Sequence, residues 1–293
     1  MNNNLIKAAK SSMPERLKPV GKELRNRFRC YTSSIRLLPS FIIIGAQRAG
    51  TTSLFKYMCQ HPNLVSPLGK EIHFFDLNYE KGLSWYRSRF PVKNRSFLPE
   101  IRKARNDLIT GEASPYYIFH PLVPERIKRH FPEIKLIVLL RNPVDRAYSH
   151  YDHQRRQGRE SLSFEEAIEK EESRLSGEKE KIHEKENYSS FAYRRFSYIK
   201  RGEYANQLES WFDLFPREQI LVIWSEEFFS EPQAKLNSAF TFINQPEAEI
   251  DVEKKYNQGE YEPMSGSTRE KLREHFEPHN RRLESLLNRE LPW

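Results

Sequence analysis

The chain of 293 residues is 38% hydrophobic and 13% aromatic, a composition that is typical of a globular protein and excludes a disordered one. Its length allows one large α/β domain or two small ones, and no run approaches the roughly 20 apolar residues of a membrane-spanning helix. The net charge of +8 does not indicate a DNA-binding protein, because residues 1–39 hold nine Lys/Arg and two Glu, while the remainder holds 39 basic and 38 acidic side chains.

Residues 1–38 are therefore predicted to form a basic N-terminal arm. The arm has no apolar run followed by a small-residue cleavage site, so we expect no secretory signal and a cytoplasmic location. Cys30 and Cys59 lack the spacing of metal ligands. We expect a solvated, partly helical tail; peripheral contact with an anionic membrane or polymer is the alternative, and nucleic acid is not expected as a partner.

The body of the chain alternates between segments with the pattern of buried strands and segments with the pattern of helices. Strands are predicted at 41–44, 107–110, 135–140 and 219–224, and helices at 52–60, 121–130, 143–157 and 203–214. This alternation predicts one α/β domain over residues 39–293, with a P-loop-like central parallel sheet and helices on both faces.

Two later segments have a different character. Residues 164–187 are almost wholly charged after the first turn, which predicts an exposed helix that runs into a flexible insertion. Near the C-terminus, two amphipathic helices are predicted on either side of Pro278, followed by a Leu-Pro-Trp end that packs back onto the body.

The first motif, "GAQRAGTTS", joins the first strand to the first helix. Gly45 and Gly50 are five apart, as in the loop of nucleoside triphosphatases, but Thr51 stands where those enzymes have lysine. Amides at the start of the helix, the hydroxyl groups of the Thr-Thr-Ser run and the charge of Arg48 favour phosphate binding. A plain strand-to-helix turn capped by Thr or Ser is the alternative.

The second motif is "KEIHFFD", residues 70–76. In an extended segment Glu71 and His73 project to the same side, with Ile72 opposite, which makes them a candidate acid–base pair. Taken alone, the motif fits better with a solvated Lys-Glu pair beside a core His-Phe-Phe.

The third motif is "LIVLLRNPVDRAYSHY". Arg141 follows a buried strand, at the edge of an open parallel sheet where ligands bind, and Ser149 lies about two helical turns later on the side that Asp145 also faces. A guanidinium and a hydroxyl group at this spacing can hold a second phosphate. An Arg–Asp surface pair is an equal alternative.

Taken together, these motifs resemble those of the sulfotransferases that use 3′-phosphoadenosine 5′-phosphosulfate (PAPS), and among them the heparan-sulfate and related carbohydrate branch. The resemblance runs from residue 39 to the C-terminus and also rests on "GLSWYRSRFP", "GEASPYY", "RGEYANQLESWF" and "HNRRLESLLNRELPW". Without a Golgi-type membrane anchor, the chain looks like the soluble bacterial members.

The resemblance implies a role for each motif. Glu71 would be the base that deprotonates the acceptor, with His73 and Asp76 completing the acceptor side. Arg141 and Ser149 would hold the 3′-phosphate of PAPS, at the opposite end of the nucleotide from the 5′-phosphosulfate. The 5′-phosphosulfate would be held by the loop, in which Arg48 is also counted as catalytic: Arg48, Ala49, Gly50, Thr51, Thr52 and Ser53.

The reaction implied is in-line sulfuryl transfer, without a metal ion, to a hydroxyl or amine of a carbohydrate or glycolipid. A kinase-like phosphotransferase, and a non-enzymatic binding protein that acts through the basic arm, remain the alternatives.

Three departures from the family pattern bear on the acceptor. Arg48 replaces a common lysine, and Ala113-Ser114-Pro115 replaces a Lys-Thr-Pro of the heparan sulfate enzymes. Residues 256–266 carry glutamates where those enzymes have a basic loop, which leaves Lys254 and Lys255 as the nearest cations. A less charged glycan, a glycolipid or a small alcohol is therefore predicted to fit at least as well as a highly sulfated polyanion.

Overall fold

The structure is a computed structural model that describes residues 18–93, 108–253 and 263–293. Lys254, Lys255 and most of the segment 256–266, which carries glutamates in place of the family's basic loop, lie outside these residues. In chain order the elements are α2 (Lys18–Tyr31), η2 (Ser33–Ile35), β1 (Phe41–Gly45), α3 (Thr51–Met58), α4 (Phe74–Leu77), η3 (Tyr79–Lys81), α5 (Gly82–Ser88), β2 (Gly111–Ala113), α6 (Val123–His130), β3 (Lys135–Leu140), α7 (Pro143–Arg156), α8 (Phe164–Glu169), α9 (Glu171–Leu175), α10 (Glu178–Glu184), α11 (Phe191–Arg195), η5 (Lys200–Gly202), α12 (Tyr204–Phe212), η6 (Arg217–Gln219), β4 (Ile220–Trp224), α13 (Ser225–Ser230), α14 (Pro232–Phe242) and α15 (Gly266–Leu287).

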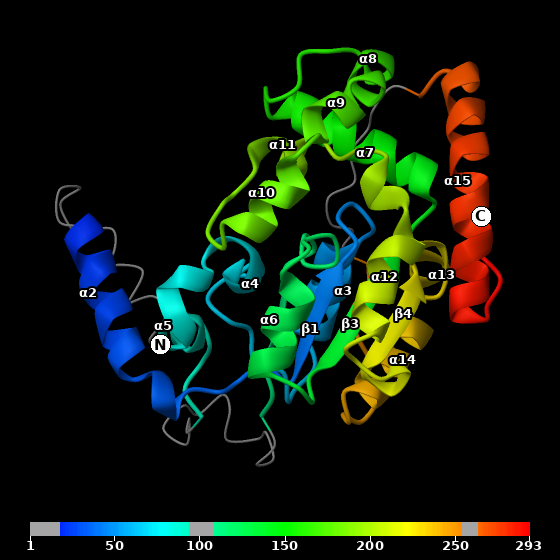
Figure 1. The fold of residues 1–293 in the computed structure, drawn as a ribbon. Helices are drawn as coiled ribbons and strands as arrows, with labels where there is room; N and C mark the ends of the chain where they lie inside the picture. The colour runs from blue at the N-terminus through cyan, green and yellow to red at the C-terminus, as the bar shows by residue number, and fades with distance from the viewer. Residues whose placement is uncertain (1–17, 94–107, 254–262) are drawn as a thin grey trace.

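The centre of the fold is a parallel sheet in the order β2-β1-β3-β4, flanked by helices (Figure 1), so the predicted α/β architecture is confirmed. Phe41 of β1 lies opposite Gly111 on one side and Lys135 on the other. All of β1 and the last five residues of β3 are buried, as expected for parallel strands covered on both faces. The predicted helices at 52–60, 121–130, 143–157 and 203–214 are confirmed as α3, α6, α7 and α12, with ends shifted by up to two residues.

The strand predicted at 107–110 is wrong in position. Ile109 forms only an isolated parallel bridge with Leu64, residue 107 lies outside the described residues, and the strand that pairs with β1 is β2. The side chain of Glu112 in β2 is fully buried and accepts hydrogen bonds from Tyr86 (2.7 Å) and Ser114 (2.7 Å). A buried carboxylate with such partners can occupy a sheet, although a hydrophobicity pattern alone rejects it.

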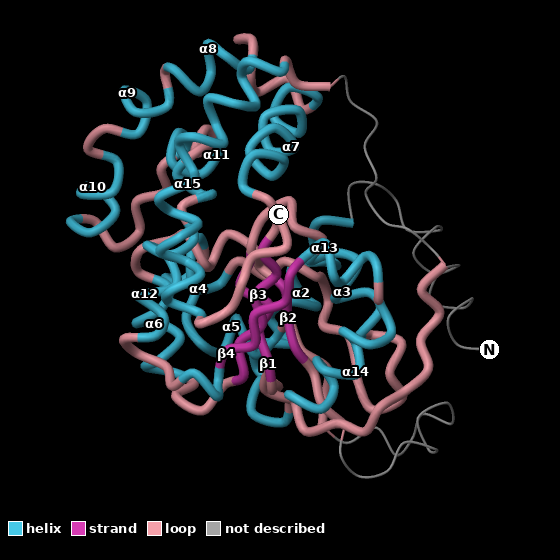
Figure 2. The backbone as a smooth tube through the Cα atoms, turned by 90° about the vertical axis from the view of Figure 1, so that its right-hand side faces the viewer, coloured by secondary structure: helices cyan, strands magenta, loops and turns pink. Residues whose placement is uncertain are grey.

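The charged segment 164–187 is not one exposed helix that leads into an insertion. It forms α8, α9 and α10, whose inward side chains Phe164 and Ile182 are buried. Glu171 is also buried and accepts hydrogen bonds from the backbone N–H groups of Ile199 (2.7 Å) and Lys200 (2.8 Å). Helices α7 to α11 gather at one end of the molecule, beyond the end of β3 from which α7 begins (Figures 1 and 2).

The C-terminal prediction is half right. The two helices expected around Pro278 are a single helix, α15, because Phe276 before the proline and Leu283 after it are both buried against the body. Such tertiary packing outweighs the cost of about 3 kcal/mol that proline imposes inside a helix. The packing of the C-terminal end is confirmed: Trp293 lies edge-on to Trp224, with ring centroids 5.3 Å apart.

The described part of the predicted arm contacts the body next to α5. Arg29 donates hydrogen bonds to the carbonyl oxygens of Ser88 (2.6 Å) and Phe90 (2.8 Å), and Arg36 also donates to Phe90 (2.9 Å). Residues 1–17 lie outside the described residues, so the extent of the arm stays a prediction. Among the helices that the structure describes, none has the length and apolar character needed to cross a bilayer.

Candidate active site

The loop between β1 and α3 opens at the carboxyl edge of the sheet. Gly50 has φ +99°, and a Cβ atom there would lie 2.9 Å from the ring of Phe229, so this position requires glycine. The hydroxyl of Ser225 in α13 also stabilises the loop by donating a hydrogen bond to the carbonyl oxygen of Ala49 (2.8 Å). Helix α3 begins at Thr51, so its first N–H groups point toward the mouth of the loop, as phosphate binding requires.

The predicted site for a second phosphate adjoins this loop. The Nε of Arg48 donates to the hydroxyl of Ser149 on α7 (3.1 Å), and Arg141 donates to the carbonyl oxygen of Arg48 (3.2 Å). The fold thus brings the loop arginine and the two residues of the third motif into direct contact. Asp145 pairs instead with Arg269 of α15 (2.7 Å), so the alternative of an Arg141–Asp145 pair does not apply.

The acid–base candidates of the second motif form a hydrogen-bonded row. His73 Nε2 lies 3.2 Å from Glu71 Oε2, and His73 Nδ1 lies 2.7 Å from Asp76 Oδ2. The side chain of Asp76 is fully buried behind the histidine, whereas 42% of the Glu71 side chain is exposed to the cleft. The predicted pairing of Glu71 and His73 on one side is therefore present, although His73 adopts a left-handed conformation at the start of α4 rather than an extended one.

This row fixes the charges of its members. Burial alone would lower the pKa of His73, but Asp76 and Glu71 outweigh it and raise that pKa to about 9. Burial would likewise raise the pKa of Glu71, but His73 and Lys70 outweigh it and lower that pKa to about 2. At neutral pH the row therefore contains an imidazolium at His73 next to the ionised carboxylate of Glu71.

Lys70 is a functional candidate that the sequence reasoning treated only as a solvated partner of Glu71. Its ammonium group donates to Glu71 (2.8 Å) and also to the hydroxyl of Thr52 in the phosphate loop (2.9 Å). It therefore connects the predicted donor site with the predicted acceptor side. The sequence feature that could have pointed to Lys70 is its position next to Glu71 in the second motif.

The space between these groups is a cleft of about 1240 Å³. Of the predicted site residues, Ala49 and Asp76 are not on its surface, because both are buried behind it. The predicted site residues on its surface are Arg48, Gly50, Thr51, Thr52, Ser53, Glu71, His73, Arg141 and Ser149.

The far wall of the cleft carries arginines that the sequence reasoning missed. Arg194 and Arg195 come from α11, and Arg156 comes from the end of α7. Arg156 pairs with Asp152 (2.6 Å), but in the described part of the chain no carboxylate lies within salt-bridge distance of Arg194 or Arg195. Burial and the neighbouring Arg194 lower the pKa of Arg195 to about 10, so it remains a cation at neutral pH.

The fold is a P-loop-like α/β fold, and its cleft brings the loop predicted to bind phosphate next to the predicted acid–base pair, an arrangement that favours a group transferase. Residues 38–287 match the family model of the sulfotransferase domain, and the chain belongs to this family, in its PAPS-dependent, heparan-sulfate-like branch. The enzyme class expected from the sequence is therefore confirmed.

Individual relatives agree with this membership. A sulfotransferase from Alicyclobacillus acidocaldarius, known from its crystal structure, is 33% identical with a TM-score of 0.64, over 87% of this chain and 97% of that one. Membrane-associated sulfotransferase kil1 of Dictyostelium discoideum is 26% identical over 95% of this chain and 71% of its own length. Human heparan sulfate glucosamine 3-O-sulfotransferase 3B1 is 31% identical over 72% of this chain, and the match spans 47% of that longer protein.

Proposed function

We propose that this chain transfers the sulfuryl group of PAPS to a hydroxyl or amine group of a carbohydrate acceptor, without a metal ion in the reaction. One observation carries the proposal: Lys70 bonds to both Thr52 of the phosphate loop and Glu71 of the acid–base row, so that the predicted donor and acceptor sites meet in one cleft. In the transfer, a bond forms between the acceptor oxygen or nitrogen and sulfur while the bond from sulfur to the 5′-phosphate oxygen breaks. The products are the sulfated acceptor and adenosine 3′,5′-bisphosphate.

Both ends of the donor have cationic or N–H partners in this arrangement. The N–H groups at the start of α3 and the hydroxyls of Thr51, Thr52 and Ser53 would hold the 5′-phosphosulfate. Arg141 and Ser149 would hold the 3′-phosphate. Because the side chain of Arg48 already donates to Ser149, we assign its charge to the side of the 3′-phosphate as well as to the loop.

Glu71 would act as the base toward the acceptor. Its low pKa keeps it ionised, and a weak base suffices if the transition state is loose, because the acceptor then loses its proton only late in the transfer. Lys70 would stabilise the negative charge that grows on the leaving phosphate, since its ammonium already reaches Thr52. His73 and Asp76 would orient the carboxylate of Glu71.

The charge of the cleft favours an acidic carbohydrate as the acceptor. Arg194 and Arg195 have no carboxylate partner among the described residues, and both face the cleft beyond the donor site. They supply cations to the cleft that the sequence analysis did not count when it predicted that a weakly charged acceptor would fit at least as well as a highly sulfated polyanion. Heparan sulfate, named in the human relative, is an acidic polysaccharide of this kind.

The test is an incubation of the chain with sulfur-labelled PAPS and four acceptors: an acidic glycan, a neutral glycan, a glycolipid and a phenol. We expect label on the acidic glycan first, with mass measurement to locate the added sulfo group. Label only on the phenol or on the neutral glycan would refute the acceptor assignment. No label on any acceptor, together with no binding of adenosine 3′,5′-bisphosphate, would refute the donor assignment too.

A further inference from the structure

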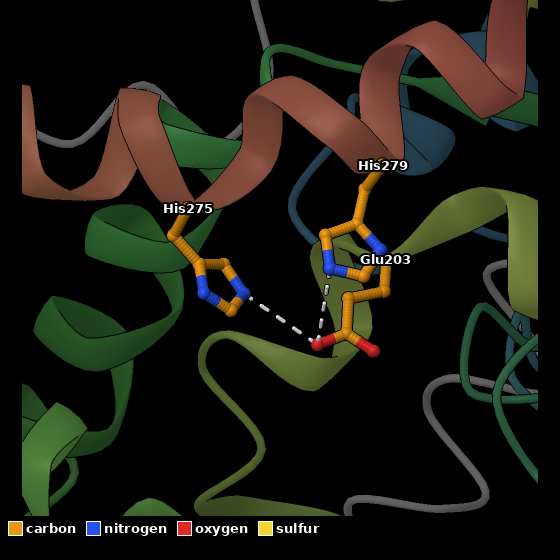
Figure 3. Close-up of side chains that lie close together, drawn as sticks. All are labelled: Glu203, His275 and His279. Carbon is orange, nitrogen blue, oxygen red and sulfur yellow. Dashed lines mark ion pairs between the residues drawn. The ribbon is translucent and has the colours of Figure 1, made fainter.

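A second cluster of side chains lies away from the cleft, between α12 and α15. His275 and His279 are four residues apart on α15 and therefore project from the same face of the helix toward Glu203, which immediately precedes α12 (Figure 3). Their Nε2 atoms lie 3.5 Å and 3.9 Å from the same oxygen of Glu203, Oε1. The three potential ligand atoms all lie within 4.8 Å of one another.

These groups have the chemistry of a transition-metal site. Two imidazole nitrogens and a carboxylate oxygen are the protein ligands of many zinc ions, with a water molecule in the fourth position. Bonds of about 2.0–2.1 Å in a tetrahedron place ligand atoms about 3.4 Å apart, so the observed separations need to close by only a few tenths of an ångström for the two ion pairs. The histidine side chains are 40% and 26% exposed, which leaves them room to turn.

The carboxylate is already held in place by its surroundings. Glu203 is 5% exposed, and its second oxygen accepts a hydrogen bond from Asn206 (3.2 Å), which in turn accepts one from Arg282 (2.8 Å). Such outer partners orient metal ligands and strengthen metal binding.

Lys200 competes for the same carboxylate oxygen. Its ammonium group lies 3.1 Å from Glu203 Oε1, and its side chain is 54% exposed, so it can turn into solvent at little cost. The cluster can therefore be read as an ion-pair network or as a metal site, and Lys200 distinguishes the two, because it would support a network and oppose a metal.

We propose that Glu203, His275 and His279 bind a divalent transition-metal ion of the Zn²⁺ class, which clamps the C-terminal helix α15 to the start of α12. None of the three residues lines the cleft, so the ion would take no part in sulfuryl transfer. Its role would be structural: Arg201, two residues before Glu203, lines the cleft and donates to Gln47 of the phosphate loop, so the clamp would steady one wall of the site.

The experiment is calorimetric titration of chelator-treated full-length protein with Zn²⁺. We expect saturable binding of one ion per chain and a melting temperature that rises by several degrees in excess Zn²⁺. The double change His275→Ala and His279→Ala should lower the affinity about 100-fold or more, whereas His183→Ala, an exposed histidine on α10, should leave it unchanged.

Lys200→Met is a second test, which leaves the three proposed metal ligands intact. If the site binds a metal, this change should raise the Zn²⁺ affinity about two- to fivefold, the fold-change that an exposed ion pair is worth. Absence of saturable binding, full binding by the double variant, or an affinity that falls with Lys200→Met would each overturn the proposal. None of these results depends on activity, so they leave the proposed function untouched.

Discussion

Glu71→Gln is the sharpest test of the proposed acid–base role. Glutamine has the size of glutamate and keeps an oxygen that can accept the hydrogen bond of Lys70, now 2.8 Å long, but it does not take up a proton at neutral pH. A general base typically contributes 10²–10⁴-fold. We therefore expect turnover to fall by at least ~10²-fold, which corresponds to about 2.7 kcal/mol of transition-state stabilisation.

The same change should leave donor binding near the wild-type value. Glu71 contacts Lys70 and His73, whereas the donor phosphates are assigned to the loop and to Arg141. Removing this negative charge from the cleft should not weaken the binding of an anionic donor. Calorimetry with adenosine 3′,5′-bisphosphate measures the affinity for the nucleotide. Rapid mixing with labelled PAPS and acceptor in a single turnover measures the rate of the transfer step.

Glu80→Gln is the matched control, because Glu80 is an exposed carboxylate in η3 and belongs to the same part of the chain. It should have wild-type turnover. Wild-type turnover in Glu71→Gln would remove Glu71 from its role as the base. Loss of donor binding in Glu71→Gln would move the residue to the donor site.

Two further variants and a pH profile test other parts of the cleft. Arg141→Ala should weaken binding of adenosine 3′,5′-bisphosphate far more than that of adenosine 5′-phosphate in calorimetry, and an equal loss for both would contradict the 3′-phosphate assignment. The double change Arg194→Ala and Arg195→Ala should raise KM for an acidic glycan about tenfold or more while the affinity for the donor stays the same; an unchanged KM would remove α11 from the acceptor site. Because the pKa of His73 is raised from 6.5 to about 9, its charged form contributes stability that is complete below pH 6.5 and is lost as the pH rises through about 9. We expect kcat/KM to fall over the same upper range, and a flat profile to pH 10 would show that the imidazolium is not needed.

The parts of the fold that could be predicted are those with a local signal. The runs of Ile, Leu and Val at 41–44 and 135–140 have one physical explanation, which is burial on both faces of a parallel sheet. The strand β2 has no such signal, since Glu112 occupies its middle and accepts hydrogen bonds from Tyr86, Ser114 and Tyr117, which all lie outside the strand. Its position depends on contacts that appear only after folding.

The residues of the cleft also fall into two groups, those that the sequence predicts and those that it does not. The loop glycines, Glu71 and Arg141 stand next to strand ends or in recognisable motifs, so the sequence predicts them. Arg194 and Arg195 stand in "FAYRR", which reads as an ordinary exposed helical turn. They reach the cleft because α11 is packed over it, with Arg201 donating to the carbonyl oxygens of Tyr193 and Arg194. No local pattern contains that information.

The contact between Lys70 and Thr52 also changes the meaning of the missing loop lysine. The sequence comparison places arginine at position 48, where the family commonly has lysine, and arginine is a poor proton donor because its guanidinium does not titrate near neutral pH. In the folded chain the ammonium of Lys70 reaches the loop from the neighbouring motif and lies within 2.9 Å of Thr52, while Arg48 turns toward Ser149. Two cations are thus present where one was expected, and they face different parts of the cleft. The substitution at position 48 therefore leaves an ammonium group beside the loop, next to the carboxylate proposed as the base, and adds a guanidinium on the side proposed for the 3′-phosphate.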